Sequence, residues 1–245
     1  MRRMKALGVV LFLLLWMVLS IVIQPMFLPM PHTVFVQLCH AVGTSSFWLD
    51  VGTTLYRLSI GFGVGACLGV AVGLLVGSSR VVHTLSEFVI DFFRSVPGTS
   101  LFPLFLLIFG LGDASKWGIA AYSAFLISLF NTAYGVKHSS KTRTLVARTM
   151  RATRSQLFLK VVLPEALPHV VVGLRLAVSS ALIYIVVSEM FMGTTSGLGY
   201  RIYNANVLFQ VREMYSSILV AGLIGYSLNQ ILVALERRFV HWAGK

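Results

Sequence analysis

Long apolar stretches alternate with short polar segments along this chain. Six of the stretches hold about 20 mostly apolar residues each, the length that crosses a ~30 Å hydrocarbon core as a helix. The six predicted spans are residues 6–23, 55–77, 85–111, 116–136, 169–192 and 215–235. The third is interrupted at Val96-Pro97-Gly98 and carries Asp91 and Arg94, so its first part is expected to lie at the interface. The pattern predicts an all-α membrane protein with about six transmembrane helices.

The composition supports a membrane protein and argues against a soluble one. Of the 245 residues, 57% are hydrophobic and only 11% are charged, whereas a soluble domain carries roughly 25% charged residues. The net charge is +12, which in a soluble protein would suggest a nucleic-acid partner. Here the basic residues gather in loops and near the ends of the chain. Membrane topology therefore explains them, and no nucleic-acid partner is expected.

The basic residues are divided unequally between the two sides of the predicted membrane region. Fifteen fall on the side that holds both ends of the chain and four on the other. The loop at 137–164 contains seven of them, whereas residues 24–54 contain none. Because loops rich in Lys and Arg stay in the cytoplasm, both termini and the 137–164 loop are predicted to be cytoplasmic. The first apolar run lacks a small-x-small cleavage site and is interpreted as an uncleaved signal anchor. The predicted organisation is an N-terminal anchor with an external loop, residues 1–54, followed by a membrane domain, residues 55–245.

The loop at 137–164 combines its basic residues with a moderate helical pattern. Apolar residues near one helical face are opposed by arginines on the other; the apolar ones are Val146, Met150, Leu157 and Val161. Periodicity leaves two interpretations open. The segment lies on anionic lipid headgroups, or it is a helix that docks onto a soluble partner.

The second span carries a stripe of glycines spaced four residues apart. These helix-packing candidates are Gly61, Gly65, Gly69, Gly73 and Gly77. Bare faces let two helices approach closely inside a membrane, where the hydrophobic effect does not drive their association. The expected neighbour is another helix of the same chain, and the alternative is a second copy.

The break in the third span has two interpretations. It is a kink or interfacial turn, or it is a broken helix in which Thr99 or Ser100 caps a second half, with Pro103 tolerated in its first turn. The exposed N–H groups of such a half-helix attract anions, and Arg94 would add to this attraction.

Two ionisable residues, Glu189 and Arg175, lie in the fifth span. Such groups at membrane depth are functional candidates. They are interpreted first as structural anchors or gate-region contacts, and second as part of a proton relay.

Motifs for bond chemistry are absent from the sequence. It contains no G-x-x-x-x-G-K-[ST], no G-x-S-x-G and no H-E-x-x-H, and its six histidines show no ligand spacing. This chain is therefore not expected to bind ATP through a P-loop, to hold a metal or cofactor, or to act as an enzyme. Its two cysteines, Cys39 and Cys67, do not suggest a disulfide or a metal site.

Several motifs between residues 55 and 242 occur in the order and spacing of a known family. They are Arg94-Ser95-Val96-Pro97, Pro103-Leu104, the FGLGDASK run at 109–116, Asn131-Thr132 with Gly135, residues 152–176, Ser188-Glu189-Met190, Gly197-Leu198-Gly199-Tyr200, and Glu236-Arg237-Arg238 with Trp242. The chain resembles the inner-membrane permease of binding-protein-dependent ABC importers. The resemblance is closest to the nitrate/sulfonate/taurine type.

The resemblance implies the fold of an ABC importer type I permease with a cytoplasmic coupling loop. A short helix, expected at 151–159, would enter a groove of the ATPase. The implied coupling residues are Arg148, Arg151, Ala152, Thr153, Arg154, Gln156, Leu157 and Phe158. The candidates for the translocation pathway are Arg94, Pro97, Thr99, Ser100 and Glu189. The family usually has Gly where this chain has Arg151, so either the turn is built differently or Arg151 makes a partner-specific contact.

The resemblance also implies the partners and the location of the protein. ATP and Mg would bind a separate cytoplasmic ABC ATPase, and the pathway would be completed by a second permease copy or a homologue. A periplasmic or lipid-anchored binding protein would deliver a small, anionic solute to the outer face. The chain would lie among membrane lipids in a bacterial or archaeal inner membrane. The alternatives are a permease for vitamin precursors and a secondary transporter, although the spans nearly lack the carboxylates that ion coupling needs.

Overall fold

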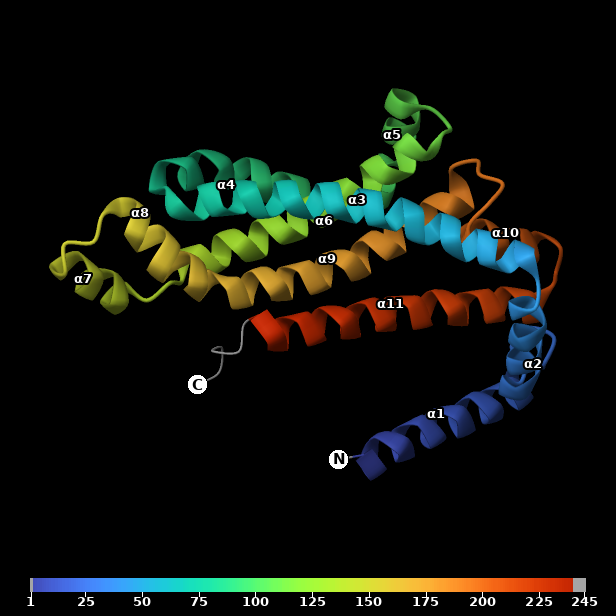
Figure 1. The fold of residues 1–245 in the computed structure, drawn as a ribbon. Coiled ribbons are helices and arrows are strands. Elements are labelled where there is room, and N and C mark those ends of the chain that lie inside the picture. Colours follow the sequence, from blue (N-terminus) through green and yellow to red (C-terminus); the bar gives the residue numbers. More distant parts are fainter. Residues whose placement is uncertain (1, 240–245) are drawn as a thin grey trace. The chain divides into compact units, whose positions relative to one another are not determined.

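The computed structural model describes residues 2–239, and nearly all of them are helical (Figure 1). The order of the elements is α1 (Arg2–Ile23), α2 (Pro31–Val42), α3 (Ser45–Ser78), α4 (Arg80–Ser95), the 3₁₀ turn η1 (Gly98–Leu101), α5 (Phe102–Phe109), α6 (Asp113–Lys137), α7 (Lys141–Thr149), α8 (Arg154–Leu157), the π-helical turn η2 (Phe158–Val162), α9 (Leu163–Phe191), α10 (Leu198–Val207) and α11 (Val211–Phe239). No strand occurs between residues 2 and 239. The predicted all-α fold class is confirmed.

The predicted spans coincide with the long apolar helices. Five helices are long and apolar enough to cross a membrane, and α4 with the following pair η1 and α5 makes a sixth if a bend of 88° is counted as one broken span. The helix α3 begins at Ser45, ten residues before the predicted start. Its first turns contain Asp50 and Thr54, whose polarity hid the helix from a hydropathy argument although both side chains have hydrogen-bond partners.

Two short helices, α2 and α10, were not predicted. Pro31 stands in the first turn of α2, where its missing N–H costs no hydrogen bond. Gly197 is the N-cap of α10 and has φ +114, a backbone conformation that suits glycine. Both helices are too short for the span pattern, so they were treated only as parts of the connections between spans.

The chain divides into two compact units, which are described separately. One is formed by the described residues up to Leu55 together with Glu189–Ile224, and the other by Tyr56–Ser188 with the described residues from Gly225 onward. The core of the first unit combines α2, the start of α3, α10 and the start of α11 through Ala41, Phe47, Val51, Leu198 and Val220.

The second unit is built around α6. Ile119, Ala120 and Ala124 of this helix are fully buried. A Cβ added to any of the five striped glycines of α3 would lie under 3.0 Å from an atom of α6, as it would 2.6 Å from Leu129 O at Gly73. On another side of α6, a Cβ on Gly173 of α9 would lie 2.6 Å from the Asn131 Cβ. The glycine stripe therefore packs within the chain.

Candidate functional site

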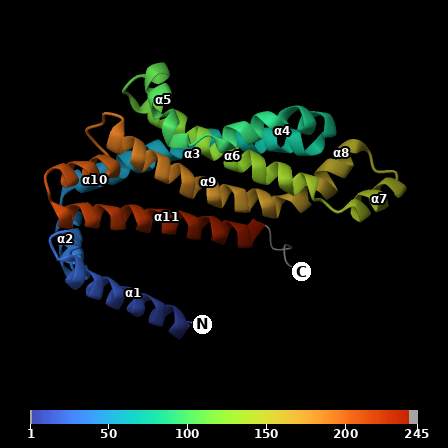
Figure 2. The same cartoon turned by 180° about the vertical axis from the view of Figure 1, so that it is seen from behind.

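The segment α7–α8 holds most of the predicted coupling residues and is named the coupling segment after that prediction. It projects beyond the adjacent ends of α4 and α6 in both views of the structure (Figures 1 and 2). Helix α7 ends at Thr149, Met150 is its C-cap, and Arg151 follows with φ +59. The Ala152 N–H donates to Ala147 O and the Arg151 N–H donates to Arg148 O. These two bonds form a Schellman motif, in which the left-handed position is usually glycine. The turn is therefore built in the way glycine would build it, with arginine in its place.

Thr153 and Gln156 form a capping box at the start of α8. The Gln156 N–H donates to Thr153 Oγ1 at 3.3 Å, and the Thr153 N–H donates to Gln156 Oε1 at 2.9 Å. The helix expected at 151–159 thus begins at Arg154, because the left-handed turn and the cap occupy the residues before it. It continues through the π-helical turn η2 into α9, where Pro164 has no N–H for the regular i→i−4 pattern.

The coupling segment presents basic and apolar side chains and no carboxylate of its own. Arg148, Arg151 and Arg154 are exposed, and Met150 is 78% exposed. Leu157 and Phe158 are half-buried. The exposed Met150 was not among the predicted contact residues, although its place on the apolar face of the helical pattern was the signal for it. Such a mixed surface is suited to a partner that offers both an apolar pocket and negative charge.

Glu165 fixes the base of the coupling segment. Its carboxylate accepts from the Ser140 N–H at 3.0 Å and from Arg143 Nη1 at 3.3 Å. Ser140 also caps α7 by accepting from the Arg143 N–H. The start of α7 is therefore held to the start of α9.

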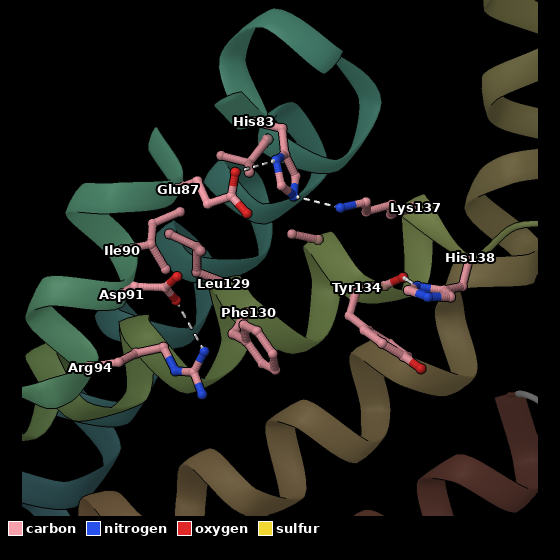
Figure 3. Close-up of a pocket in the computed structure, with 12 residues that line it drawn as sticks. His83, Glu87, Ile90, Asp91, Arg94, Leu129, Phe130, Tyr134, Lys137 and His138 are labelled. Carbon is pink, nitrogen blue, oxygen red and sulfur yellow. Dashed lines mark hydrogen bonds and ion pairs between the residues drawn. The ribbon is translucent and has the colours of Figure 1, made fainter. Parts of the chain in front are cut away.

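A hollow of about 320 Å³ lies between α4 and α6, and Arg94 lines it (Figure 3). The Arg94 guanidinium carbon lies 4.1 Å from the centre of the Phe130 ring, and Nη1 is 3.4 Å from Asp91 Oδ1. The Arg94 side chain remains 45% exposed. At the other end of the hollow, Lys137 Nζ is 3.1 Å from His83 Nε2. The hollow is thus lined by two cationic side chains, Arg94 and Lys137, by two carboxylates, Asp91 and Glu87, and by the rings of Phe130 and Tyr134.

The break between α4 and α5 lacks the capped half-helix that was one of its two interpretations. Helix α5 begins at Phe102 without a side-chain cap, and Pro103 lies in its first turn as expected. The Ser100 hydroxyl donates to Pro97 O at 2.6 Å instead of accepting from a helix N–H. Gly98 is buried against Tyr184, and a Cβ there would overlap the Tyr184 hydroxyl oxygen. The interpretation in which Thr99 or Ser100 caps the second half is therefore wrong, because α5 has no side-chain cap and the Ser100 hydroxyl is taken by a carbonyl of the turn itself. The other interpretation, a kink or interfacial turn, agrees with this geometry, and the hollow that Arg94 lines does not include residues 97–100.

Glu189 is 1% exposed and holds the start of α10 in the first unit. Its carboxylate accepts from Thr54 Oγ1 at 2.9 Å and from the Gly199 N–H at 2.9 Å, and the Leu198 N–H donates to the same Thr54 hydroxyl at 2.8 Å. A Cβ on Gly197 would overlap the Glu189 carboxylate. These contacts are those of a structural anchor.

In the second unit, Arg175 joins α9 to α11. It donates to Asn229 Oδ1 at 3.1 Å and to Glu236 Oε2 at 3.0 Å. This residue, too, has the contacts of an anchor.

A charged group around Arg201 was missed by the sequence analysis. Arg201 pairs with Asp50 at 3.2 Å and with Glu213, and Gln37 also donates to Glu213. The group ties α10 to α3, α11 and α2. The available signal was Asp50, the single charged residue of the 24–54 segment, but nothing in the sequence identified its partner.

The described residues contain no group of three or more His, Cys, Asp or Glu that could hold a metal ion. A family model described as "binding-protein-dependent transport system inner membrane component" matches residues 65–244. The putative aliphatic sulfonates transport permease protein SsuC of Bacillus subtilis is 30% identical over 90% of this chain and 80% of its own length. The taurine transport system permease protein TauC of Escherichia coli is 29% identical over 96% of this chain and 88% of its own.

Two further comparisons extend these. The bicarbonate transport system permease protein CmpB of Synechococcus elongatus is 29% identical over 78% of this chain and 68% of its own. Among solved structures, the methionine ABC transporter MetNI in inward-facing conformations superposes with a TM-score of 0.68, at 21% identity, over 78% of this chain and 96% of the other. At that identity the structural match supports the fold alone.

Proposed function

Since this chain belongs to the family of binding-protein-dependent transport system inner membrane components, it is the membrane-spanning permease subunit of an ABC importer, and we propose that its solute is a small anion. The observation that carries the proposal is the shared chemistry of the relatives' solutes. Relatives are named for sulfonates, taurine and bicarbonate, each of which bears a negatively charged oxygen group. A cation near the pathway would favour such a group over a neutral solute.

Arg94 is the proposed cation. Its guanidinium is partly exposed and is held between Asp91 and Phe130 rather than buried. Pro97, Thr99, Ser100 and Glu189 remain proposed pathway residues. In the assembled importer, Arg94→Gln is expected to lower anion uptake about two- to fivefold, the effect of ~0.3–1 kcal/mol for a partly exposed charge.

Asp91→Asn is the matched control for Arg94, because it removes the ion pair and keeps the guanidinium. Uptake of labelled sulfonate or bicarbonate should be equal to wild type or higher in this variant, with basal ATP hydrolysis unchanged in both. Normal uptake by Arg94→Gln, or loss of uptake through loss of the complex, would refute the role proposed for Arg94.

The proposed driving partner is a cytoplasmic ABC ATPase that binds ATP and Mg and docks on the coupling segment. The proposed contacts come from both helices of the segment and the turn between them: Arg148, Arg151, Ala152, Arg154, Leu157 and Phe158. Arg151 stands in a conformation that costs a non-glycine residue roughly 1–2 kcal/mol. The turn keeps the usual Schellman hydrogen bonds, so its geometry does not require arginine. We therefore infer that the Arg151 side chain makes a contact on the ATPase that glycine could not make.

The proposed assembly has a second permease copy or a homologue, and a periplasmic or lipid-anchored binding protein at the outer face. In this arrangement residues 1–54 are the anchor and external loop, residues 55–245 form the permease domain, and both termini are cytoplasmic. The uneven distribution of Lys and Arg supports this orientation. Single cysteines at Ser139 and Ser46, with Cys39 and Cys67 replaced, provide the test. An impermeant thiol reagent should label position 46 in intact cells. Labelling of position 139 instead would mean that the proposed orientation is wrong.

A further inference from the structure

Two hollows adjoin each other in the first unit, between the end of α1 and the start of α11. The first has a volume of about 530 Å³ and a wall that is apolar almost throughout: Phe12, Leu15, Trp16, Leu19, Leu28, Tyr215, Ile218, Leu219, Gly222 and Leu223. The second, of about 710 Å³, is lined on the same two segments by Pro25, Met26 and Phe27 and by residues 211–214, and it includes polar groups. Phe27 and Met214 line the polar hollow, and the next residues in the chain, Leu28 and Tyr215, line the apolar one. The two hollows are therefore neighbours on both walls.

Gly222 on the wall of the apolar hollow has no packing role within the first unit. A Cβ at this position would meet no atom within 4 Å. Glycine in a helix interior costs roughly 1 kcal/mol relative to alanine, and in membrane helices it commonly allows a close approach. Since no neighbour in this unit approaches Gly222, the space that it leaves open is available to something outside the chain.

Arg212 supplies positive charge to the polar hollow. Its side chain is exposed and forms no ion pair within the described part of the chain. The adjacent carboxylate of Glu213 is already engaged by Arg201 and Gln37, which leaves Arg212 as a cation at the mouth of an apolar groove. Trp16 and Tyr215 line the groove near this mouth, and such residues are typical of the membrane–water boundary.

We propose that the two hollows form a phospholipid site, with an acyl chain along Gly222 between α1 and α11 and the phosphate at Arg212. An amphiphile matches both halves of the site. A small anionic solute would leave the apolar hollow empty, and a helix from a second copy would fill the apolar hollow without offering a phosphate to Arg212. The site is distinct from the proposed pathway residues and does not depend on which solute is carried.

The test measures phospholipid retained by the detergent-purified importer, using native mass spectrometry after exchange into phosphatidylglycerol. Gly222→Leu places a side chain in the groove, and Gly52→Leu is its control because a Cβ at Gly52 also meets no atom within 4 Å but lies outside both hollows. Gly222→Leu should abolish the retained phospholipid and Gly52→Leu should keep it. Arg212→Gln should weaken retention about tenfold, the effect of one charge-assisted hydrogen bond.

Two results would overturn the proposal. One is wild-type retention in both Gly222→Leu and Arg212→Gln. The other is unchanged phospholipid together with loss of pairing between permease copies in Gly222→Leu, which would identify a helix of the second copy as the occupant.

Discussion

Glycine stands at five positions of α3 where the neighbouring helix leaves no room for a side chain, whereas arginine stands at the one position of the coupling segment where the backbone favours glycine. At the first set, each added Cβ would lie under 3.0 Å from an atom of α6. The Arg151 side chain is exposed, so its only unfavourable feature is the left-handed backbone conformation, with φ +59. Packing inside the chain therefore explains the α3 glycines, while Arg151 requires an explanation outside the chain.

The strongest destabilisation is expected where a side chain is added between α3 and α6. Gly73→Ala would place a Cβ 2.6 Å from Leu129 O, a backbone atom that cannot rotate away. Overpacking of this kind costs about 1–3 kcal/mol, so the variant should unfold at a lower temperature in detergent. Gly63→Ala is the control on the same helix, because its Cβ would meet no atom within 4 Å. This variant should be as stable as wild type or more stable by up to about 1 kcal/mol, and equal destabilisation by the two variants would show that helix geometry, not the α3–α6 contact, sets the requirement.

The next prediction concerns the coupling segment, where the ATPase is proposed to dock. Phe158→Ala is expected to weaken binding of the ATPase by about 2 kcal/mol, because an aromatic side chain in a desolvated pocket usually dominates such an interface. Membrane insertion should be unchanged, and uptake should be lost. The measurement is co-purification of the ATPase together with solute uptake. Phe88→Ala, at an exposed phenylalanine of α4, should leave ATPase binding intact. Normal binding by Phe158→Ala would count against the docking assignment.

The sequence predicted the features that depend on local composition and period. Apolar length gave the spans, and the four-residue spacing gave the stripe from Gly61 to Gly77. It did not distinguish Gly63, which has open space around it, from Gly65 on the same helix, which contacts α6 closely. That difference depends on the direction each residue faces relative to another helix.

The same limit applies to the polar groups. Arg201 has partners on α3 and α11, from segments far apart in the sequence. Only the fold brings these residues together, so no local sequence pattern could predict the charged group around Arg201. The interpretation of Ser100 as a cap, one of the two given for the break, was wrong for a related reason, since a hydroxyl can donate to a nearby carbonyl as readily as it accepts from a helix N–H.

Substitutions at Arg151, for which we expect the weakest change, separate the effect of backbone conformation from that of charge. Arg151→Gly relieves the backbone cost and removes the guanidinium, while Arg151→Asn removes the guanidinium and still tolerates the left-handed conformation. If the side chain contacts the ATPase, both variants should bind it about five- to tenfold more weakly, which corresponds to ~1 kcal/mol. Arg151→Lys should bind with intermediate affinity, since it keeps the charge without the planar fork. The measurement is the affinity of the purified permease for its ATPase at low and high salt, and the wild-type advantage should shrink as salt screens the contact. Equal or tighter binding by Arg151→Gly would mean that the arginine is only tolerated in the turn, and the contrast with the α3 glycines would then reduce to one between a packed helix face and an unconstrained loop.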